Sequence, residues 1–270
     1  MRFRMGITDL LTDLGCSMTS VTPYALCDYR CVYCITGVQG ASSPMMSADE
    51  AVGKLREHLA AASSPPILLV GALSDAYPSV EREFGITRAI VAYLVAAGVP
   101  FTVVTKSEII LRDLDLLVAH GDRAHVQVSV CSVDDNALRS LDRSAPSGTV
   151  RFGVIDKLHN AGVRVDLNLL PWIPDVSDTE ALIARVPSEV EVVVGPLAFG
   201  PGSDQRRLLG RTYTRDEVWA RYMDEYSRYG HIENTSWIKP SLPPEENNPL
   251  YRLPALPPPA GAPTVLAARG

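Results

Sequence analysis

The sequence has few of the features that mark membrane, secreted or nucleic-acid-binding proteins. No run reaches the roughly 18 apolar residues that a transmembrane helix needs. The first residues contain no apolar stretch suited to a signal peptide. Positive charge is in deficit, because 25 Lys and Arg residues face 31 Asp and Glu residues and leave a formal net charge of -6. We therefore expect a cytoplasmic protein, with no membrane partner and no general affinity for nucleic acid.

Cysteine is also scarce, and its distribution is uneven. The chain of 270 residues has 5 cysteines, at positions 16, 27, 31, 34 and 131. An odd number with three cysteines this close together does not suit a disulfide framework. Clustered thiols in a reducing compartment indicate a metal site instead.

Short apolar runs alternate with segments of helical periodicity along most of the chain. The expected strands are residues 17–24, 66–72, 101–105, 124–130, 164–170 and 191–197, and the expected helices are 47–62, 81–97, 109–120 and 150–160. This alternation predicts an α/β fold in which right-handed βαβ units build a parallel sheet covered by helices. Six units fit either an open sheet or a partial barrel, and both place functional loops at the carboxyl ends of the strands.

Composition divides the chain into four parts. We expect an N-terminal extension over residues 1–16, the α/β domain over 17–200, a helical segment over 201–239 and a proline-rich tail over 240–270. The tail cannot form helices or central strands. Within the helical segment, aromatic residues recur at helical spacing over 215–229, which predicts a packing stripe that closes the open side of the barrel.

The strongest motif lies in the long loop over residues 25–44. Cys27, Cys31 and Cys34 occur there with a spacing that lets three thiolates converge on one iron–sulfur cluster. Three ligands leave one iron without a protein ligand, which is typical of a catalytic site. A zinc site completed by a histidine, by Cys16 or by Cys131 is the alternative.

The pattern Cys-x3-Cys-x2-Cys after the first strand, with Tyr33 before the last cysteine, resembles the radical S-adenosylmethionine (SAM) superfamily. Further segments are similar to the branch related to spore photoproduct lyase, namely 22–27, 74–82, 104–107, 111–117, 128–132, 145–147, 161–163 and 171–174. The resemblance implies a partial (β/α)6 TIM-like barrel with a 4Fe-4S cluster whose unique iron binds SAM. It also implies that Tyr33 packs against the adenine of SAM.

The same resemblance implies the chemistry. Reduction of the cluster by an external electron donor, such as flavodoxin or ferredoxin, cleaves SAM to methionine and a 5′-deoxyadenosyl radical, which abstracts hydrogen from a substrate. The cofactor carries the difficult chemistry, and the protein supplies orientation and exclusion of water.

Polar residues at strand ends are the candidate cofactor ligands. The resemblance implies that Lys106 pairs with the SAM carboxylate, although a solvated loop lysine is the alternative. Ser74 and Ser132 are placed to donate hydrogen bonds to SAM, or else simply end their strands. Asp75 is the only carboxylate where many members of the superfamily carry an amine-binding Gly-Gly-Glu-like segment, and it could instead begin a turn. Asn168, near the end of the fifth strand, is expected to reach the cofactor.

Two departures separate this chain from the photoproduct lyases. Ala72 stands where those lyases carry a hydrogen-donating cysteine, and Ile35 replaces the tyrosine after the last cluster cysteine. Together with the net acidic charge, they make repair of a DNA dimer a poor expectation. Cys131 is a candidate hydrogen donor or a small core residue. Tyr77 is a candidate catalytic residue, and Trp172 could line the substrate pocket or act as a hydrophobic plug.

The sequence thus predicts a radical SAM enzyme that acts on a small molecule or a peptide. One alternative is a radical SAM lyase that modifies a nucleotide or nucleic acid. The other is a non-catalytic zinc or iron–sulfur binding protein. Lysis, oxidoreduction and epimerisation are all compatible with the motif, because function depends on the pocket rather than on the fold.

Overall fold

The computed structural model describes residues 9–15, 17–34, 36–37, 39–199 and 203–238. Cys16, Ile35 and the proline-rich tail lie outside the described residues, so the expectations for them stay predictions. Within the described ranges, no helix is long and apolar enough to cross a membrane.

One sheet of eight strands organises the molecule, in the order β1-β2-β3-β4-β5-β6-β7-β10. The six expected parallel strands are confirmed as neighbours from β2 to β7, and β10 adds a seventh parallel strand next to β7. The strands are β2 (Met18–Val21), β3 (Ile67–Val70), β4 (Phe101–Thr105), β5 (Ala124–Ser129), β6 (Arg164–Trp172), β7 (Glu191–Pro196) and β10 (Thr235–Trp237). The stretch expected as an N-terminal extension includes β1 (Leu11–Gly15), which pairs antiparallel with β2.

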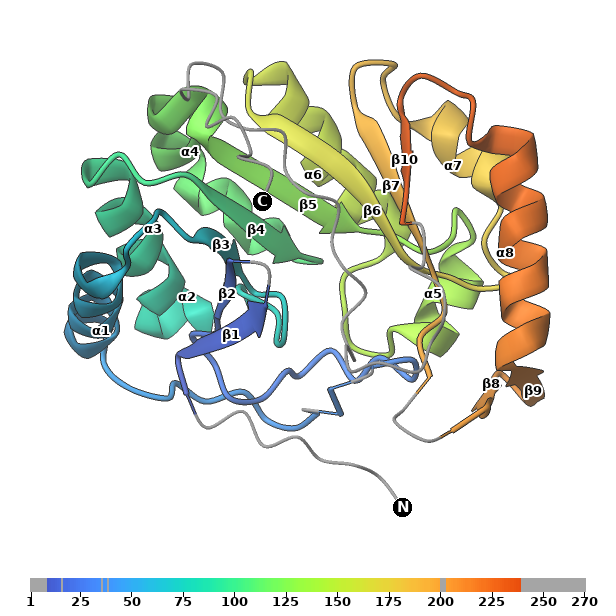
Figure 1. Ribbon diagram of the computed structural model, residues 1–270, viewed down its shortest axis with the longest axis horizontal. Coiled ribbons are helices and arrows are strands. Elements are labelled where there is room, and N and C mark those ends of the chain that lie inside the picture. Colours follow the sequence, from blue (N-terminus) through green and yellow to red (C-terminus); the bar gives the residue numbers. More distant parts are fainter. Residues whose placement is uncertain (1–8, 16, 35, 38, 200–202, 239–270) are drawn as a thin grey trace, which may run out of the picture.

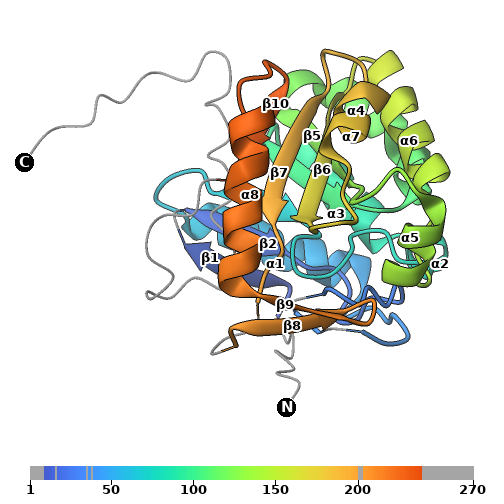
Figure 2. The same ribbon diagram turned by 90° about the vertical axis from the view of Figure 1, so that its right-hand side faces the viewer.

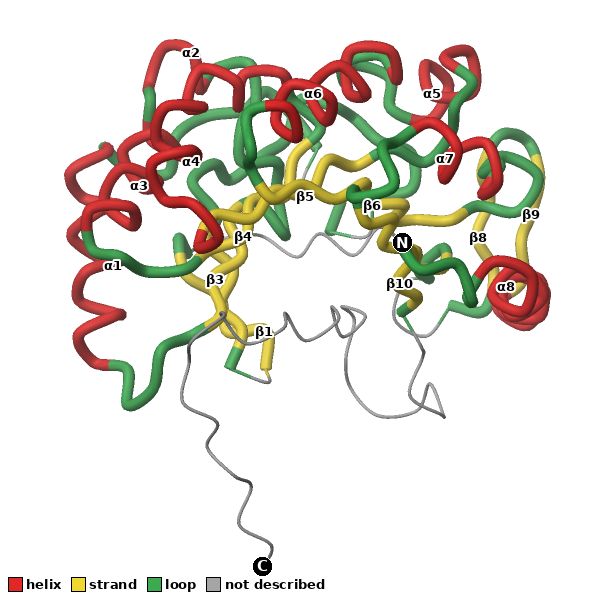
Figure 3. Tube along the Cα trace, turned by 90° about the horizontal axis from the view of Figure 1, so that it is seen from above, coloured by secondary structure: helices red, strands yellow, loops and turns green. Residues whose placement is uncertain are grey.

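The sheet curls into a crescent whose two edges are β1 and β10 (Figure 3). Within the described residues these edge strands do not pair with each other, so the barrel is partial and open. Because strand order follows chain order, each crossover places its helices on the convex side of the crescent (Figures 1 and 3). The concave side is left to the residues at the carboxyl ends of the strands.

The helical layer follows the expected segments with two breaks, one of which is that the helix expected over 109–120 begins as a separate 3-10 turn. Ser47 caps the first helix, since its hydroxyl oxygen accepts the Glu50 N–H. The helix expected over 81–97 is two helices, because Gly85 adopts a left-handed φ of 62° that ends the first one. The helices are α1 (Ala48–Ala61), α2 (Glu81–Phe84), α3 (Ile86–Ala96), α4 (Leu114–His120), α5 (Asp135–Leu141), α6 (Gly148–Asn160) and α7 (Thr179–Arg185), with 3-10 turns at Glu108–Asp113 and Gly121–Arg123.

After β7 the chain forms a hairpin of β8 (Gln205–Leu208) and β9 (Arg211–Thr214), followed by α8 (Arg215–Tyr229). The aromatic stripe of α8 is a packing stripe as expected: Tyr222 contacts Trp172, Trp219 and Trp237, with ring centroids 5.3 to 5.9 Å apart. However, α8 lies outside the crescent beside β10 (Figures 2 and 3). It extends the outer layer and does not close the open side, because its aromatic face is used against the sheet edge.

Candidate active site

A cavity lies on the concave side, at the carboxyl ends of the parallel strands. Cys27, Cys31 and Cys34 line it from the loop over residues 25–44, which we call the cluster loop. Strand ends and the loops after them supply the other walls, among them Ser74, Asp75, Lys106, Gln127, Ser129 and Asn168. The cavity therefore brings the three cysteines together with four polar residues that the sequence predicted as cofactor ligands, and with Gln127 and Ser129, which it did not predict.

The cluster loop is folded back on itself. The Cys34 N–H donates to the Cys31 carbonyl at 3.1 Å, and the Gly40 N–H donates to the Cys27 carbonyl at 3.1 Å. From the C-terminal hairpin, Arg206 donates to the Cys34 carbonyl at 3.4 Å. The three thiols are thus positioned by main-chain hydrogen bonds on both sides of the loop.

All three cluster-loop cysteines are free thiols. Burial, aided by the nearby Asp75 carboxyl, raises the pKa of the Cys27 thiol to about 12. Burial also raises the pKa of Cys31 above its ordinary value. Protonated thiols must lose their protons to bind a metal, so loading this site is coupled to proton release.

The donors that line the cavity are three free thiols from one loop, the set of protein ligands that a cuboidal iron–sulfur cluster can take. No group of three His, Cys, Asp or Glu side chains is gathered as around one metal ion in the part of the chain that the structure describes. In a cuboidal cluster each thiolate binds a different iron, so the thiols surround a volume rather than a point. Cys131 is buried at 2% exposure and does not line the cavity, so it is not placed to complete a zinc site. The donor set fits an iron–sulfur cluster.

Two polar atoms in the cavity wall have no partner among the described residues. Ser74 Oγ and Asn168 Oδ1 are buried and form no hydrogen bond there. The Asn168 amide is oriented by its own Nδ2, which donates to Ser129 Oγ at 3.2 Å. An unsatisfied buried polar atom costs about 1–3 kcal/mol, so both atoms point to a polar ligand. The amine, carboxylate and ribose hydroxyls of SAM offer the required groups.

Lys106 provides the cationic group of the cavity. Its Nζ lies 5.7 Å from the centroid of the Tyr33 ring, a cation–π arrangement, and both residues line the cavity. Burial disfavours the charged form, but the acidic groups Cys31 and Asp142 outweigh it, so the pKa of Lys106 lies above its ordinary value. Lys106 is therefore an ammonium group at neutral pH, as pairing with a carboxylate requires.

Asp75 joins the ends of two strands. Its Oδ1 accepts the Tyr77 N–H at 2.9 Å and the Thr105 hydroxyl at 2.7 Å, and its Oδ2 accepts the Lys106 N–H at 2.8 Å. Burial raises its pKa. These bonds confirm that Asp75 organises the turn after β3. Its carboxylate still lines the cavity, so its expected contact with the SAM amine stays a prediction.

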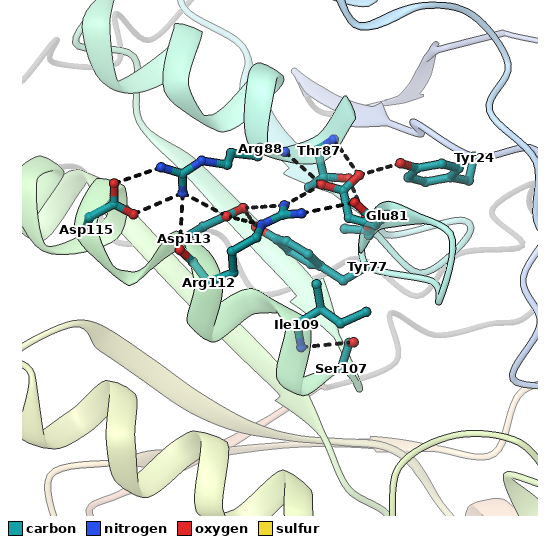
Figure 4. A network of polar contacts seen from close by, with 11 residues as sticks. Tyr24, Tyr77, Glu81, Thr87, Arg88, Ser107, Ile109, Arg112, Asp113 and Asp115 are labelled. Carbon is teal, nitrogen blue, oxygen red and sulfur yellow. Dashed lines mark hydrogen bonds and ion pairs between the residues drawn. The ribbon is translucent and has the colours of Figure 1, made fainter. Parts of the chain in front are cut away.

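Tyr77 points into the helical layer instead of the cavity. Its side chain is fully buried, and its hydroxyl donates to Asp113 Oδ2 at 3.0 Å. Asp113 also binds Arg112, which pairs with Glu81, so a network of two buried carboxylates and a partly exposed guanidinium holds Tyr77 and Glu81 (Figure 4). Tyr77 is part of this support, and the structure does not bring it to the cavity.

Three other candidates also lie away from the cavity. Ser132 donates to the Val176 carbonyl at 3.1 Å and accepts the Asp134 N–H at 3.1 Å. Trp172 is a plug, since it is 2% exposed and its indole donates to Thr179 Oγ1 at 3.1 Å. Cys131 is a small core residue. β5 ends at Ser129, so neither Ser132 nor Cys131 belongs to the strand, and the structure brings neither to the cavity. Their expected roles toward SAM and the substrate stay predictions.

The residues that do line the cavity from β5 are Gln127 and Ser129, which the sequence reasoning missed. A signal was present. His125, Gln127 and Ser129 alternate with Ala124, Val126 and Val128, and alternate residues of a strand share one face.

Residues 21–184, more than half of the chain, match the family described as the radical SAM superfamily. The chain belongs to this superfamily. Its members are enzymes that use a 4Fe-4S cluster and SAM, also written AdoMet. The cavity with three free thiols, a buried ammonium group and unpaired polar atoms lies within or next to the matched residues.

Curated relatives are distant. An uncharacterised protein of Methanocaldococcus jannaschii is 24% identical over 175 residues, which are 61% of this chain and 64% of that protein. An uncharacterised protein of Acidianus two-tailed virus is 26% identical over 177 residues, 60% of this chain and 59% of that protein. The chain thus spans less than two thirds of the length of these relatives.

Solved structures share the fold. A spore photoproduct lyase mutant with bound AdoMet and dinucleoside spore photoproduct superposes with a TM-score of 0.64 at 14% identity, over 86% of this chain and 79% of that one. SuiB of Streptococcus suis bound to its precursor peptide SuiA gives 0.59 at 11% identity, over 81% and 48%. At such identities the likeness extends to the fold alone, and it agrees with the partial TIM-like barrel.

Proposed function

We propose that this chain is a radical SAM enzyme that acts on a small-molecule or peptide substrate. The observation that carries the proposal is the convergence of three free thiols and two unpaired buried polar atoms on one cavity. When bound, the cluster and SAM supply reductive cleavage of a carbon–sulfur bond and a 5′-deoxyadenosyl radical. The residues of this chain supply the rest.

Each wall of the cavity has a separable task. Cys27, Cys31 and Cys34 hold the cluster. Lys106 pairs with the SAM carboxylate, and Tyr33 flanks the adenine. Ser74 Oγ and Asn168 Oδ1 bind the polar groups of SAM and so fix the orientation in which it reacts. The cysteines and Lys106 thus bind the cofactors, whereas Ser74 and Asn168 orient SAM.

The remaining lining keeps water away from a reactive intermediate. Leu73, Val104, Leu170 and Pro171 contribute apolar surface around the polar groups. Exclusion of water protects a radical from side reactions. Gln127 is left for the substrate, because its side chain forms no hydrogen bond with a described residue and the roles in SAM binding fall to other residues.

The nature of the lining also narrows the reaction. Ala72 lines the cavity where a donor cysteine would stand in a photoproduct lyase. Among the described residues, the cavity is lined by no thiol other than those of the cluster loop. A reaction in which a protein thiol returns hydrogen to the product radical therefore has no support here. A net charge of -6 further favours a small molecule or peptide over nucleic acid.

Anaerobic reconstitution with iron and sulfide tests the proposal. We expect about four irons per chain and release of 5′-deoxyadenosine when SAM and dithionite are added. The variant with Cys27→Ala, Cys31→Ala and Cys34→Ala should lose both properties, whereas Cys131→Ala should keep both. Release of 5′-deoxyadenosine by the triple variant would refute the proposal, and bound zinc without SAM cleavage would favour the non-catalytic alternative.

A further inference from the structure

A second hollow lies on the outer side of the cluster loop. Asp28 and Tyr29 line it from the cluster loop, and Ser144 and Pro146 line it from the segment after α5. Tyr29 also lines the cysteine cavity. Its side chain is 6% exposed and is held by a hydrogen bond from its hydroxyl to the Tyr77 carbonyl at 2.9 Å. One fixed aromatic side chain thus separates the outer hollow from the cavity that holds the three thiols.

The cluster loop runs antiparallel to the segment after α5. A β-bridge pairs Cys31 with Asp142. On one side of the bridge the Val32 N–H donates to the Leu141 carbonyl at 2.8 Å. On the other side the Ser144 N–H donates to the Tyr29 carbonyl at 3.1 Å. In this register, residue 30 lies across from residue 143.

Both of these facing residues are arginines. Arg30 and Arg143 are exposed, and neither forms an ion pair with a described residue. Like charges directly across from each other destabilise a strand pair. Arg30 also has a φ of 55°, a conformation that glycine adopts without strain. The fold alone gives no reason for this arrangement.

Other charges near the hollow do not cancel the two arginines. Arg82 pairs with Glu108 at 2.8 Å, so this pair is neutral. The Asp28 carboxylate keeps its negative charge, since its Oδ2 accepts hydrogen bonds only from the neutral Ser79 N–H and hydroxyl and its buried Oδ1 has no partner among the described residues. The two arginines, each next in sequence to a residue that lines the hollow, outnumber this one carboxylate, so net positive charge remains beside the hollow in a protein whose net charge is -6.

We propose that Arg30, Arg143 and the hollow beside Tyr29, together the arginine surface, dock a small acidic protein that carries one electron, of the flavodoxin or ferredoxin type. The inference rests on the proposed function, which requires an external reductant. Charge complementarity would steer the carrier to the point where its redox centre is separated from the cluster by Tyr29.

The step transfers one electron. The reduced carrier is oxidised by one equivalent, the cluster is reduced by one equivalent, and no covalent bond forms or breaks. Arg30 and Arg143 position the carrier and take no part in the chemistry. Dithionite is a small reductant that needs no docking surface, so it separates the role of the surface from the function of the site.

The test compares two variants with the same change in charge. The first carries Arg30→Glu and Arg143→Glu. The control carries Lys157→Glu and Arg228→Glu, which reverse two exposed charges in the last turns of α6 and α8, at helix ends remote from the cluster loop. Reconstituted enzyme is mixed with reduced flavodoxin, and cluster bleaching is followed by stopped-flow absorbance. Binding of oxidised flavodoxin is measured separately, at two salt concentrations.

At low salt we expect the first variant to be reduced by flavodoxin about tenfold more slowly than the wild type, with weaker binding. Release of 5′-deoxyadenosine with dithionite should be unchanged. The control variant should match the wild type in every measurement, and salt should slow the wild type toward the variant. A reduced ferredoxin in place of flavodoxin shows which carrier is preferred.

Several results would overturn the inference. One is that the wild type and the first variant are reduced at equal rates by flavodoxin, and also at equal rates by ferredoxin, while dithionite supports turnover. Binding of a short single-stranded oligonucleotide that depends on the two arginines, without any effect on carrier reduction, would assign the surface to nucleic acid. If dithionite fails even with the wild type, the proposed function itself fails, whereas carrier binding can still be measured. Should Arg30→Glu prevent cluster loading, Arg143→Glu alone, outside the cluster loop, carries the test.

Discussion

The buried ion pair behind the cluster loop should be among the costliest polar contacts to break. Arg151 Nη1 donates to Asp142 Oδ2 at 2.6 Å, and the two side chains are 1% and 0% exposed. Arg151 also donates to the carbonyls of Ser129 and Pro146. Arg151→Met keeps an apolar stem but leaves a buried carboxylate without its guanidinium partner. We expect the free energy of unfolding at neutral pH to fall by about 3–5 kcal/mol.

The pH dependence of this loss has a definite sign. Burial alone would raise the pKa of Asp142, but the positive charges of Lys106 and Arg151 outweigh it and hold the pKa below its usual value. The stabilisation in the wild type is therefore complete at neutral pH and is lost as pH falls through the folded-state pKa. In Arg151→Met only Lys106 and the Tyr33 hydroxyl still oppose burial, so the pKa of Asp142 lies higher than in the wild type. The folded variant then binds this proton at a higher pH than the folded wild type does, so the difference in stability between the two proteins narrows as the pH falls.

Urea unfolding followed by tryptophan fluorescence, on iron-free protein at about pH 7 and about pH 5, measures both effects. The matched control is Arg82→Met, which breaks the pair with Glu108 at 2.8 Å, where the side chains are 61% and 40% exposed. That variant should lose no more than about 1 kcal/mol. A loss below about 1 kcal/mol for Arg151→Met, or a gap that widens toward acid pH, would refute the reasoning.

Three further outcomes follow from the geometry. Ser74→Ala should weaken binding of SAM to the reconstituted enzyme about tenfold by equilibrium titration, with unchanged iron content, because it removes a ligand-facing hydroxyl; unchanged affinity would show that Ser74 faces no ligand. Gly71→Ala should lower the free energy of unfolding by more than about 3 kcal/mol, because φ is 92° and a Cβ would lie 2.5 Å from the Val104 carbonyl oxygen; wild-type stability would contradict this. Tyr77→Phe should cost about 1 kcal/mol of stability through the lost bond to Asp113 and leave turnover unchanged, so a large loss of turnover with intact stability would restore its catalytic role.

The parallel sheet could be predicted because each of its strands is a short run of neighbouring residues with a recognisable composition. The runs that form β3 and β7 are almost wholly apolar, as strands covered on both faces must be. The edge strands could not be predicted in this way. β1 contains a polar centre, and β10 has three residues whose pairing with β7 is a long-range contact. Such short edges take their conformation from the neighbouring strand rather than from their own composition.

The site residues likewise could be predicted where the signal is local in the sequence, and could not where it depends on long-range contacts. The cluster cysteines could be predicted because their spacing within one loop is itself the geometric requirement. Lys106 and Asp75 could be predicted because each lies within a residue or a short turn of a strand end. Tyr77 could not be placed, because the direction of its side chain depends on the buried charges of Asp113 and its partners, which come from a different crossover.

The polar residues of the concave face show how more of the site could have been found. His125, Gln127 and Ser129 occupy alternate positions of an otherwise apolar strand, and Asp166 and Asn168 do the same on the next. In a strand with both faces against apolar layers, this alternation of polar and apolar residues would be destabilising, since burying a polar group without a partner costs free energy. The pattern therefore indicates a face that lines a polar cavity. It also separates tasks within that cavity: His125 and Asp166 bind each other at 2.6 Å, whereas Asn168 Oδ1 stays unpaired among the described residues, so the ligand-facing positions are those nearest the carboxyl ends of the strands.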